Sequence, residues 1–297
     1  MQQRLERNRE LTLDNILFAT DFSPASEAAL AYAVTIADHY HSMLYVAHVI
    51  NSEPFDLISD EASAAAVRQA HLQASERIDR LLKAWHLPDG RSQTIVAEGS
   101  VAEVLIDAIQ QNHIGLVVLG THGRRAFKKL LLGSIAEEVF RRAPCPVMTV
   151  GPKIKSVPTA VELKHILYPL EFVPDASETV KYAISLAEQY GAHLTVMHAQ
   201  ENTPSAAVRQ ERIAEPVEHW FEDHIPKDSD LRRRVRFEIG FGSAAETILN
   251  CATKTAADLI VMSVNRVDPV IAGHLPKPDT GYEVVSRAPC PVLTIAQ

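Results

Sequence analysis

Three glycines in the middle of the chain are spaced in a way that suits phosphate binding. The apolar run Leu116 to Leu119 ends in Gly120-Thr121-His122-Gly123. After nine intervening residues, Gly133-Ser134 opens a helical pattern at Ile135. A strand that ends in a glycine-rich turn before a helix N-terminus directs backbone N–H groups toward an anion. A side chain at these positions would keep the backbone away from the anion or forbid positive φ. The spacing therefore predicts a nucleotide site.

The spacer between the second and third glycines is basic. It contains Arg124, Arg125, Lys128 and Lys129. These side chains either make charge-assisted contacts with a triphosphate or form a solvated basic loop. Arg124 is the first candidate for a phosphate contact because it follows Gly123 directly, whereas His122 is better explained as a structural hydrogen-bonding residue.

Length and composition indicate a soluble protein of two domains. The chain has 297 residues, of which 46% are hydrophobic, and a net charge of -8. This charge argues against general nucleic-acid binding, and the run Arg232-Arg233-Arg234 is better read as a solvated strand edge than as a nucleic-acid patch. No apolar run reaches the ~18 residues of a membrane span, and residues 1–10 lack the apolar centre of a signal peptide. We expect a cytoplasmic protein.

Cysteine and histidine do not form a recognisable metal or disulfide pattern. The three cysteines, Cys145, Cys251 and Cys290, lie in or beside apolar runs and are expected to be small buried residues in a reducing compartment. The 13 histidines show no zinc spacing. His48 and His198 occupy matching strand positions, which favours buried, hydrogen-bonded histidines over ligands.

The chain contains two copies of one domain. Residues 16–48 and 166–198 align without a gap and share eleven identities, and the segment 142–147 returns as 287–292. A period this long indicates duplicated domains and not a solenoid. We expect an N-terminal extension at 1–12, a first domain at 13–151, a linker at 152–160 and a second domain at 161–297.

Within each copy, apolar strands alternate with helical patterns. In the first copy the expected strands are residues 15–20, 43–50, 93–97, 116–119 and 146–150. Ser23-Pro24 predicts one helix start, a second helix is expected over 59–86, and capping boxes are predicted at Ser100–Glu103, Ser134–Glu137 and Ser243–Glu246. This alternation predicts an α/β fold in which each domain is a five-stranded, parallel, doubly wound sheet flanked by helices. Its ligand would lie at the carboxyl ends of the strands.

The sequence resembles the universal stress protein family in its tandem form. The resemblance is carried by residues 16–23, by His48-Val49, by the Gly-x2-Gly-x9-Gly-Ser motif at 120–134 and by the two Ala-Pro-Cys-Pro-Val segments. It covers nearly the whole chain after the first ~12 residues. The resemblance implies a Rossmann-like fold of the adenine nucleotide alpha hydrolase type, and an ATP site with Mg or Mn.

The resemblance also implies roles for individual residues. Thr20 and Asp21 would lie near the adenosine, and Val49 would contact the adenine through its backbone. The remaining positions, which would hold ribose and phosphates, are Gly120, Gly123, Arg124, Gly133, Ser134 and Ile135. Two alternatives stay open: Asp21 as a turn or cap residue, and Ser134 as a helix cap. The final strands of the two halves would pair antiparallel across an intrachain pseudo-twofold axis, and two chains could pair again as a homodimer.

The second copy has lost this pattern. Its equivalent strand, Leu259 to Met262, ends in Ser263-Val264-Asn265-Arg266, and Gly133-Ser134 falls on Pro278-Asp279. Proline removes an N–H donor and aspartate repels phosphate, so we expect no ATP in this half. Glu171 takes the acidic position after the first strand. Gly273 and Gly281 leave open a different pocket.

Three functions are consistent with these residues. The first is an ATP-binding stress-response regulator that acts through nucleotide-dependent conformation and an unidentified protein partner. The second is a slow ATPase or adenylyl-transferring enzyme, and the third is an interaction scaffold that binds no nucleotide. The sequence has no Walker lysine motif, Ser-His-Asp order or paired carboxylates, so no catalytic residue and no metal ligand is assigned.

Overall fold

The computed structural model of the chain describes two compact units. The described residues are 11–50, 60–88, 90–121, 132–151, 153–154, 161–171, 176–200, 218–219, 221, 224–266 and 279–297. One unit runs from Thr12 to Val161, and the other comprises Glu162 to Ile295 together with Leu11 and Gln297. The described residues of each unit contain five strands of the predicted kind, and the doubly wound α/β fold is confirmed for both.

The first unit is built on a sheet whose central strand is the first in the sequence. In spatial order the strands are β3 (Ser92–Glu98), β2 (Met43–Ile50), β1 (Asn15–Ala19), β4 (Leu116–Gly120) and β5 (Val147–Val150). All neighbouring pairs are parallel. The strand order reverses between β1 and β4, and in such sheets ligands bind beyond the carboxyl ends of the strands at this reversal.

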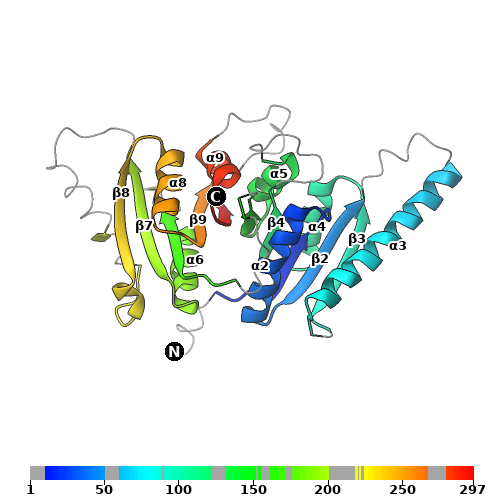
Figure 1. Cartoon of the computed structure of the whole chain (residues 1–297), viewed down its shortest axis with the longest axis horizontal. Helices are drawn as coiled ribbons and strands as arrows, with labels where there is room; N and C mark the ends of the chain where they lie inside the picture. Colours follow the sequence, from blue (N-terminus) through cyan, green and yellow to red (C-terminus); the bar gives the residue numbers. More distant parts are fainter. Residues whose placement is uncertain are drawn as a thin grey trace. The chain divides into compact units, whose positions relative to one another are not determined.

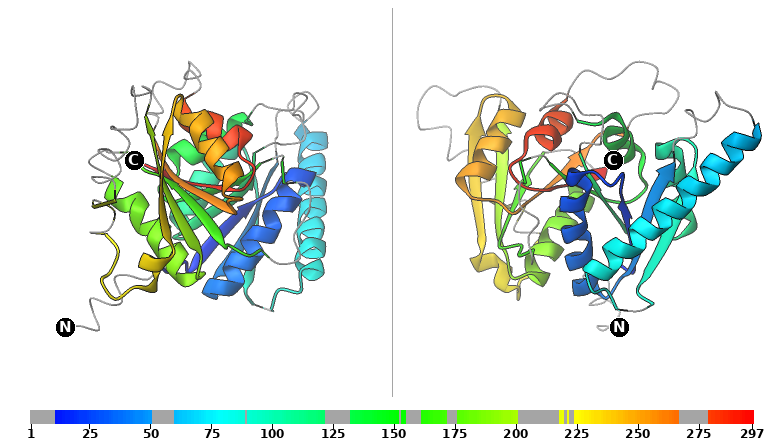
Figure 2. Two further views of the ribbon diagram at one scale, coloured as in Figure 1. Left: turned by 60° about the vertical axis from the view of Figure 1, so that its left-hand side comes forward. Right: turned by 45° about the vertical axis from the view of Figure 1, so that its right-hand side comes forward.

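The described helices of this unit cover both faces of its sheet. They are α2 (Pro24–Tyr40), α3 (Asp60–Ala84), α4 (Val101–Gln111) and α5 (Ser134–Arg142). The helices α2 and α3 lie over one face, and α4 packs beside α5 over the other (Figures 1 and 2). This arrangement follows from right-handed crossovers that run in opposite directions from the central strand.

The core of the first unit consists of strand residues and the inner face of α2. Ile16, Leu17 and Val117 are fully buried, as is Ala33 on α2. The helix begins as predicted, with Ser23 as the N-cap accepting a hydrogen bond from the backbone N–H of Ser26 and with Pro24 in the first turn. The long helix α3 is different, because among its described side chains only Ala74 and Ile78 are buried.

The second unit repeats this plan. Its strands in spatial order are β10 (Val292–Ala296), β9 (Leu259–Val264), β6 (His165–Pro169), β7 (His193–Gln200) and β8 (Val235–Phe241). Its described helices are α6 (Ala176–Gln189), α8 (Ala244–Lys254), α9 (Thr280–Arg287) and the short 3-10 helix η3 (Asp230–Arg233). As in the first unit, β6 lies between β7 and β9 and runs parallel to both.

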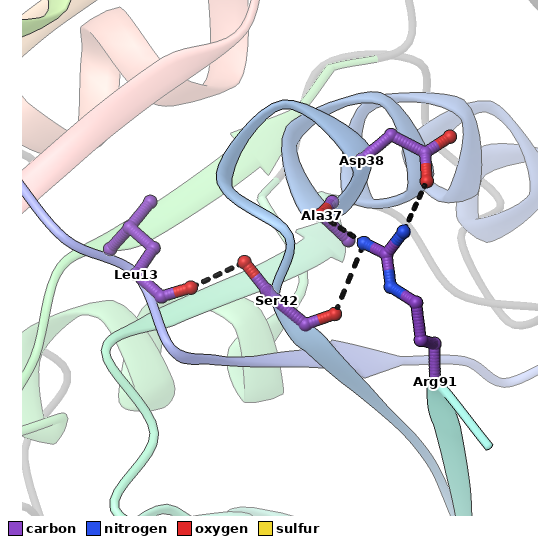
Figure 3. Close-up of polar contacts among 5 residues, drawn as sticks. All are labelled: Leu13, Ala37, Asp38, Ser42 and Arg91. Atoms are coloured by element: carbon purple, nitrogen blue, oxygen red, sulfur yellow. Dashed lines mark hydrogen bonds and ion pairs between the residues drawn. The ribbon is translucent and has the colours of Figure 1, made fainter.

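In both units an arginine just before a strand donates hydrogen bonds to backbone carbonyl groups at the C-terminal end of a helix. Arg91, just before β3, donates to the carbonyl oxygen of Ala37 at 2.7 Å and to Oδ1 of Asp38 at 3.3 Å (Figure 3). Next to this contact, the hydroxyl of Ser42 donates a hydrogen bond to the carbonyl oxygen of Leu13. Such donors satisfy helix C-terminal carbonyl groups.

In the second unit, Arg234 donates to the carbonyl oxygen of Ala187 at 3.1 Å. Its neighbour Arg232 donates to the carbonyl oxygens of Ile225 and Pro226. Two members of the triple-arginine run thus hold backbone within the unit and are not simply a solvated edge.

The predicted capping boxes are wrong. Ser100 and Ser243 are the N-caps of α4 and α8, but their side chains make no capping hydrogen bond. The glutamates instead pair with arginines of the neighbouring helix: Glu103 accepts from Arg142 at 2.8 Å and Glu246 from Arg287 at 2.6 Å. In the ion pair both partners are charged, whereas the N-cap backbone N–H group of a capping box is neutral and can be hydrated by water instead.

The third box fails for a different reason. Gly133 is the N-cap of α5, so Ser134 is the first helical residue and cannot serve as the cap. Glu137 pairs with Arg141 one turn later, at 3.2 Å, and that arginine is almost completely buried.

Candidate functional site

The turn after β1 forms one side of the candidate site. Thr20 is buried, its hydroxyl accepts the backbone N–H of Phe22 at 2.9 Å, and its backbone N–H donates to Ala47 at 2.9 Å. Asp21 is half-buried, and its Oδ1 accepts the backbone N–H of Ser23 at 3.0 Å. Asp21 therefore acts as the turn residue that the sequence left as an alternative, and Thr20 holds the same turn.

Gly120 lies where β4 approaches the start of α2. A Cβ atom at this position would lie 2.9 Å from the carbonyl carbon and oxygen of Ala25 and 3.0 Å from the backbone nitrogen of Ser26. These atoms belong to the backbone of a helix and cannot move aside cheaply. The first glycine of the motif is thus required by packing within the protein, a reason that the sequence did not reveal.

The N-terminus of α5 lies next to the end of β4. The backbone N–H of Gly133 donates to the carbonyl oxygen of Thr121 at 2.8 Å, which fixes the start of the helix beside the strand. Because Gly133 is the N-cap, the first turn of α5 receives no side-chain cap. Ser134 is exposed and Ile135 is 43% exposed. An uncapped helix N-terminus with exposed flanking side chains is able to receive an anion.

The turn also contacts the neighbouring strand and the long helix. Nδ1 of His48, on β2, donates to the carbonyl oxygen of Thr20 at 2.7 Å, and its ring lies 4.5 Å from the ring of Phe22. Arg77 on α3 donates to the carbonyl oxygen of Phe22 at 3.2 Å. Val49 follows His48 and is half-buried near the carboxyl end of β2. The ends of β1, β2 and β4 therefore bring Asp21, Val49 and Gly120 to one edge of the sheet.

Two of the predicted site residues cannot be compared with the structure. Gly123 and Arg124, like the rest of the basic spacer, lie outside the described residues. Their assignment to the phosphates stays a prediction from the sequence.

The second unit differs at the corresponding helix. Asp279 is the N-cap of α9, and its Oδ1 accepts the backbone N–H of Tyr282 at 2.8 Å. A carboxylate of the protein thus occupies the kind of position that an external anion would take at an uncapped helix. Burial raises the pKa of the Tyr168 hydroxyl, and the carboxylate of Glu171, which is exposed after β6, raises it further.

Both halves of the chain match one family of known proteins. Residues 12–151 and 162–296 each match the model of the universal stress protein family. The chain belongs to the universal stress protein family. A universal stress protein of Methanocaldococcus jannaschii is 28% identical over 148 residues, which are 48% of this chain and 85% of that protein. One from Mycobacterium bovis is 25% identical over 231 residues, which are 70% of this chain and 75% of that protein.

A solved structure shows the same fold over both universal stress protein domains. The crystal structure of a universal stress protein from Archaeoglobus fulgidus has a TM-score of 0.73, covers 96% of this chain and 99% of its own, and is 20% identical. At this identity the likeness establishes the fold. The duplicated architecture therefore recurs in another member of the family.

Metal ligation receives no support from the part of the chain that the structure describes. Within it, no group of three His, Cys, Asp or Glu side chains could hold an ion. His198 repeats the contact of His48, with its Nδ1 donating to the carbonyl oxygen of Leu170 at 3.1 Å. Both histidines are hydrogen-bonded, as expected from their matching strand positions. They are half-buried, however, and not fully buried as expected.

Sequence reasoning missed Arg77 and the role of Phe22. Arg77 lies 55 residues from its partner in the chain and belongs to no motif, so no local signal marked it. Phe22 is one of the residues repeated in the two copies. Its backbone has a φ of 60°, which is uncommon for an aromatic residue and marks a tightly determined turn.

None of the described helices is both long and apolar enough to cross a membrane.

Proposed function

We propose that this universal stress protein is a cytoplasmic, ATP-binding stress-response regulator that holds nucleotide in its first domain alone. The observation that carries the proposal is the contrast between two equivalent helices. The N-terminus of α5 begins with Gly133 and has no side-chain cap, whereas the N-terminus of α9 is capped by the carboxylate of Asp279.

The contrast has a direct electrostatic consequence. The first-turn N–H groups and the helix dipole make the N-terminus of α5 attractive to phosphate. At α9 the carboxylate of Asp279 already accepts one of these N–H groups and adds a negative charge, so phosphate is repelled. The two halves share a fold but have opposite preferences for an anion.

The other described residues are compatible with an adenine nucleotide in the first domain. The phosphates would lie against Gly133, Ser134 and Ile135. Asp21 would accept from the ribose hydroxyls, and the backbone at Val49 would contact the adenine. A Mg or Mn ion would be carried by the phosphate oxygens, which are ligands of the kind such ions prefer.

Nucleotide would act by changing a surface that a partner protein recognises. The helix α3 is attached to the turn after β1 by Arg77, and most of its surface faces solvent, including Leu72 at 60% exposure. A change in the turn would therefore be transmitted to a long exposed helix. The partner itself stays unidentified, and pairing of two chains is compatible with the proposal.

Thermal unfolding with and without MgATP tests the proposal. Binding to the folded state stabilises it by about 2.7 kcal/mol at 100 times the dissociation constant. We expect such a shift with the full chain, and we expect mass spectrometry of the gently purified protein to detect released adenine nucleotide. No shift and no nucleotide would favour an interaction scaffold instead. Release of phosphate from MgATP above the level of a variant that cannot bind would favour the ATPase alternative.

A further inference from the structure

The second domain has a cavity at the edge of the sheet where the first domain has its candidate site. It lies at the carboxyl ends of β6 and β9 and at the N-terminus of α9, and its volume is about 320 Å³. This volume falls at the lower end of the range of small-molecule sites. Its polar lining comes from Glu171, Ser263, Asn265, Asp279, Thr280 and Gln297.

The lining of this cavity has a negative charge. Glu171 and Asp279 contribute carboxylates, and none of the described residues around the cavity is lysine, arginine or histidine. The remaining polar side chains are hydroxyls and amides. The described lining side chains would therefore repel an anionic ligand such as phosphate and attract a cation.

Part of the cavity wall is fixed by hydrogen bonds. Asp279 is held by the backbone N–H of Tyr282, and Gln297 donates through Nε2 to the hydroxyl of Thr179 at 2.9 Å. The backbone N–H of Gln297 donates to the carbonyl oxygen of Val264 at 3.0 Å, which ties the end of β10 to β9. A preorganised wall lowers the entropic cost of ligand binding.

The shape and chemistry favour an organic cation over a bare metal ion. A metal site needs several oxygen ligands converging on one point, and the described residues contain no group of three His, Cys, Asp or Glu side chains able to hold an ion. A cavity of about 320 Å³ instead leaves room for several non-hydrogen atoms. An ammonium group donates hydrogen bonds to carboxylates, and hydroxyl or amide groups of the ligand can pair with the serine, threonine and asparagine of the lining.

We propose that the second domain binds a small ammonium-bearing metabolite in this cavity, with the carboxylates of Glu171 and Asp279 as the recognition groups. The proposal is independent of nucleotide binding in the first domain. It gives the second domain a ligand of opposite charge, and one chain then senses two classes of small molecule.

Isothermal titration calorimetry on the full chain tests this proposal. The probes are butane-1,4-diamine and ethanolamine, with butane-1,4-diol as a neutral control and Mg²⁺ as a separate arm, all at matched ionic strength. We expect the amines to bind and the diol not to. The variants Glu171→Gln and Asp279→Asn keep the shape of the side chains, and asparagine is also a good N-cap, so the fold is retained.

Each substitution should weaken amine binding by about tenfold or more, the change expected when a charge-assisted contact is lost. Asp228 is an exposed carboxylate of the same unit and is not among the residues that line the cavity, so Asp228→Asn should leave the affinity for the amines unchanged. Three results would overturn the proposal: no binding of the amines, binding of the amines that persists when Glu171→Gln and Asp279→Asn are combined in one protein, or binding of Mg²⁺ without the amines.

Discussion

The guanidinium of Arg77 lies 4.4 Å from the centre of the Phe22 ring and donates to the carbonyl oxygen of the same residue at 3.2 Å. A single side chain of the long helix α3 thus holds both the ring and the backbone of the turn that follows β1. Because His48 also contacts this turn, the ends of two strands and one helix are joined at the proposed adenosine position.

Replacing Arg77 by methionine should separate α3 from this turn. The variant keeps an unbranched side chain but loses one hydrogen bond and one cation–π contact, so we expect a loss of about 1 kcal/mol in the free energy of unfolding. Hydrogen exchange should show that ATP protects α3 in the original protein and much less in Arg77→Met. Equal protection of α3 in both would contradict the proposed transmission.

Gly120→Ala should destabilise the first domain whether or not nucleotide is bound. The added Cβ would lie 2.9 Å from the backbone of Ala25, and overpacking of this kind costs about 1–3 kcal/mol. Gly115→Ala is a matched control, since its Cβ would be 3.4 Å from a flexible leucine side chain. In urea unfolding, Gly120→Ala should have a lower midpoint than Gly115→Ala. Equal midpoints of the two variants would contradict the packing role of Gly120.

The two interhelical ion pairs should contribute to stability at neutral pH and lose this contribution in acid. Arg142 lowers the pKa of Glu103 from its ordinary value of 4.5, and Arg287 does the same to Glu246. A carboxyl group whose folded pKa is depressed stabilises the protein above the unfolded pKa, and this effect disappears as the pH falls through the folded pKa.

The urea midpoints of Glu103→Gln and Glu246→Gln should therefore lie below that of the original protein at pH 7. The difference should shrink on lowering the pH through the region of the carboxyl pKa. A difference that stays constant over this range would show that the loss is one of packing and not of charge.

Cys251 and Cys290 are buried as expected, whereas Cys145 is half-buried, and all three should react slowly in the folded protein. Burial raises the pKa of Cys145 and Cys290 to about 12 and that of Cys251 to about 11, so little thiolate exists near neutral pH. Alkylation by iodoacetamide at pH 8, followed by mass spectrometry, should be at least about a hundredfold slower than in urea. Fast alkylation of any of them in the folded chain would contradict this.

Much of the fold could be predicted from periodicity. The run Met43 to Ile50 is apolar at every position except His48 over the length of a strand, and β2 has these bounds. Ser23 followed by Pro24 gave a correct helix start, since both residues act locally on the first turn. The capping boxes were wrong because the competing partner of Glu103 is Arg142, 39 residues away, and no local pattern reports a contact between two helices.

The candidate site was less predictable. Sequence comparison of the two halves identified Asp279 as the residue opposite Ser134, and the structure adds that it caps α9. The packing reason for Gly120 depends on the distance between β4 and α2, and the contact of Arg77 with Phe22 depends on how α3 crosses the sheet. Such relationships arise from tertiary packing and leave no signal at one position of the chain.

The measurement that tests the central claim most directly is calorimetric titration of MgATP into Ser134→Asp and its control Ser243→Asp. Each variant places a carboxylate at the start of a helix, where the negative charge interacts favourably with the helix dipole, so both proteins should fold. We expect one ATP per chain for the original protein and for Ser243→Asp. For Ser134→Asp, which places a carboxylate in the first turn of α5 directly after its N-cap Gly133, we expect binding to be lost. Two ATP per chain, or undiminished binding to Ser134→Asp, would contradict the claim that only the first domain holds the nucleotide.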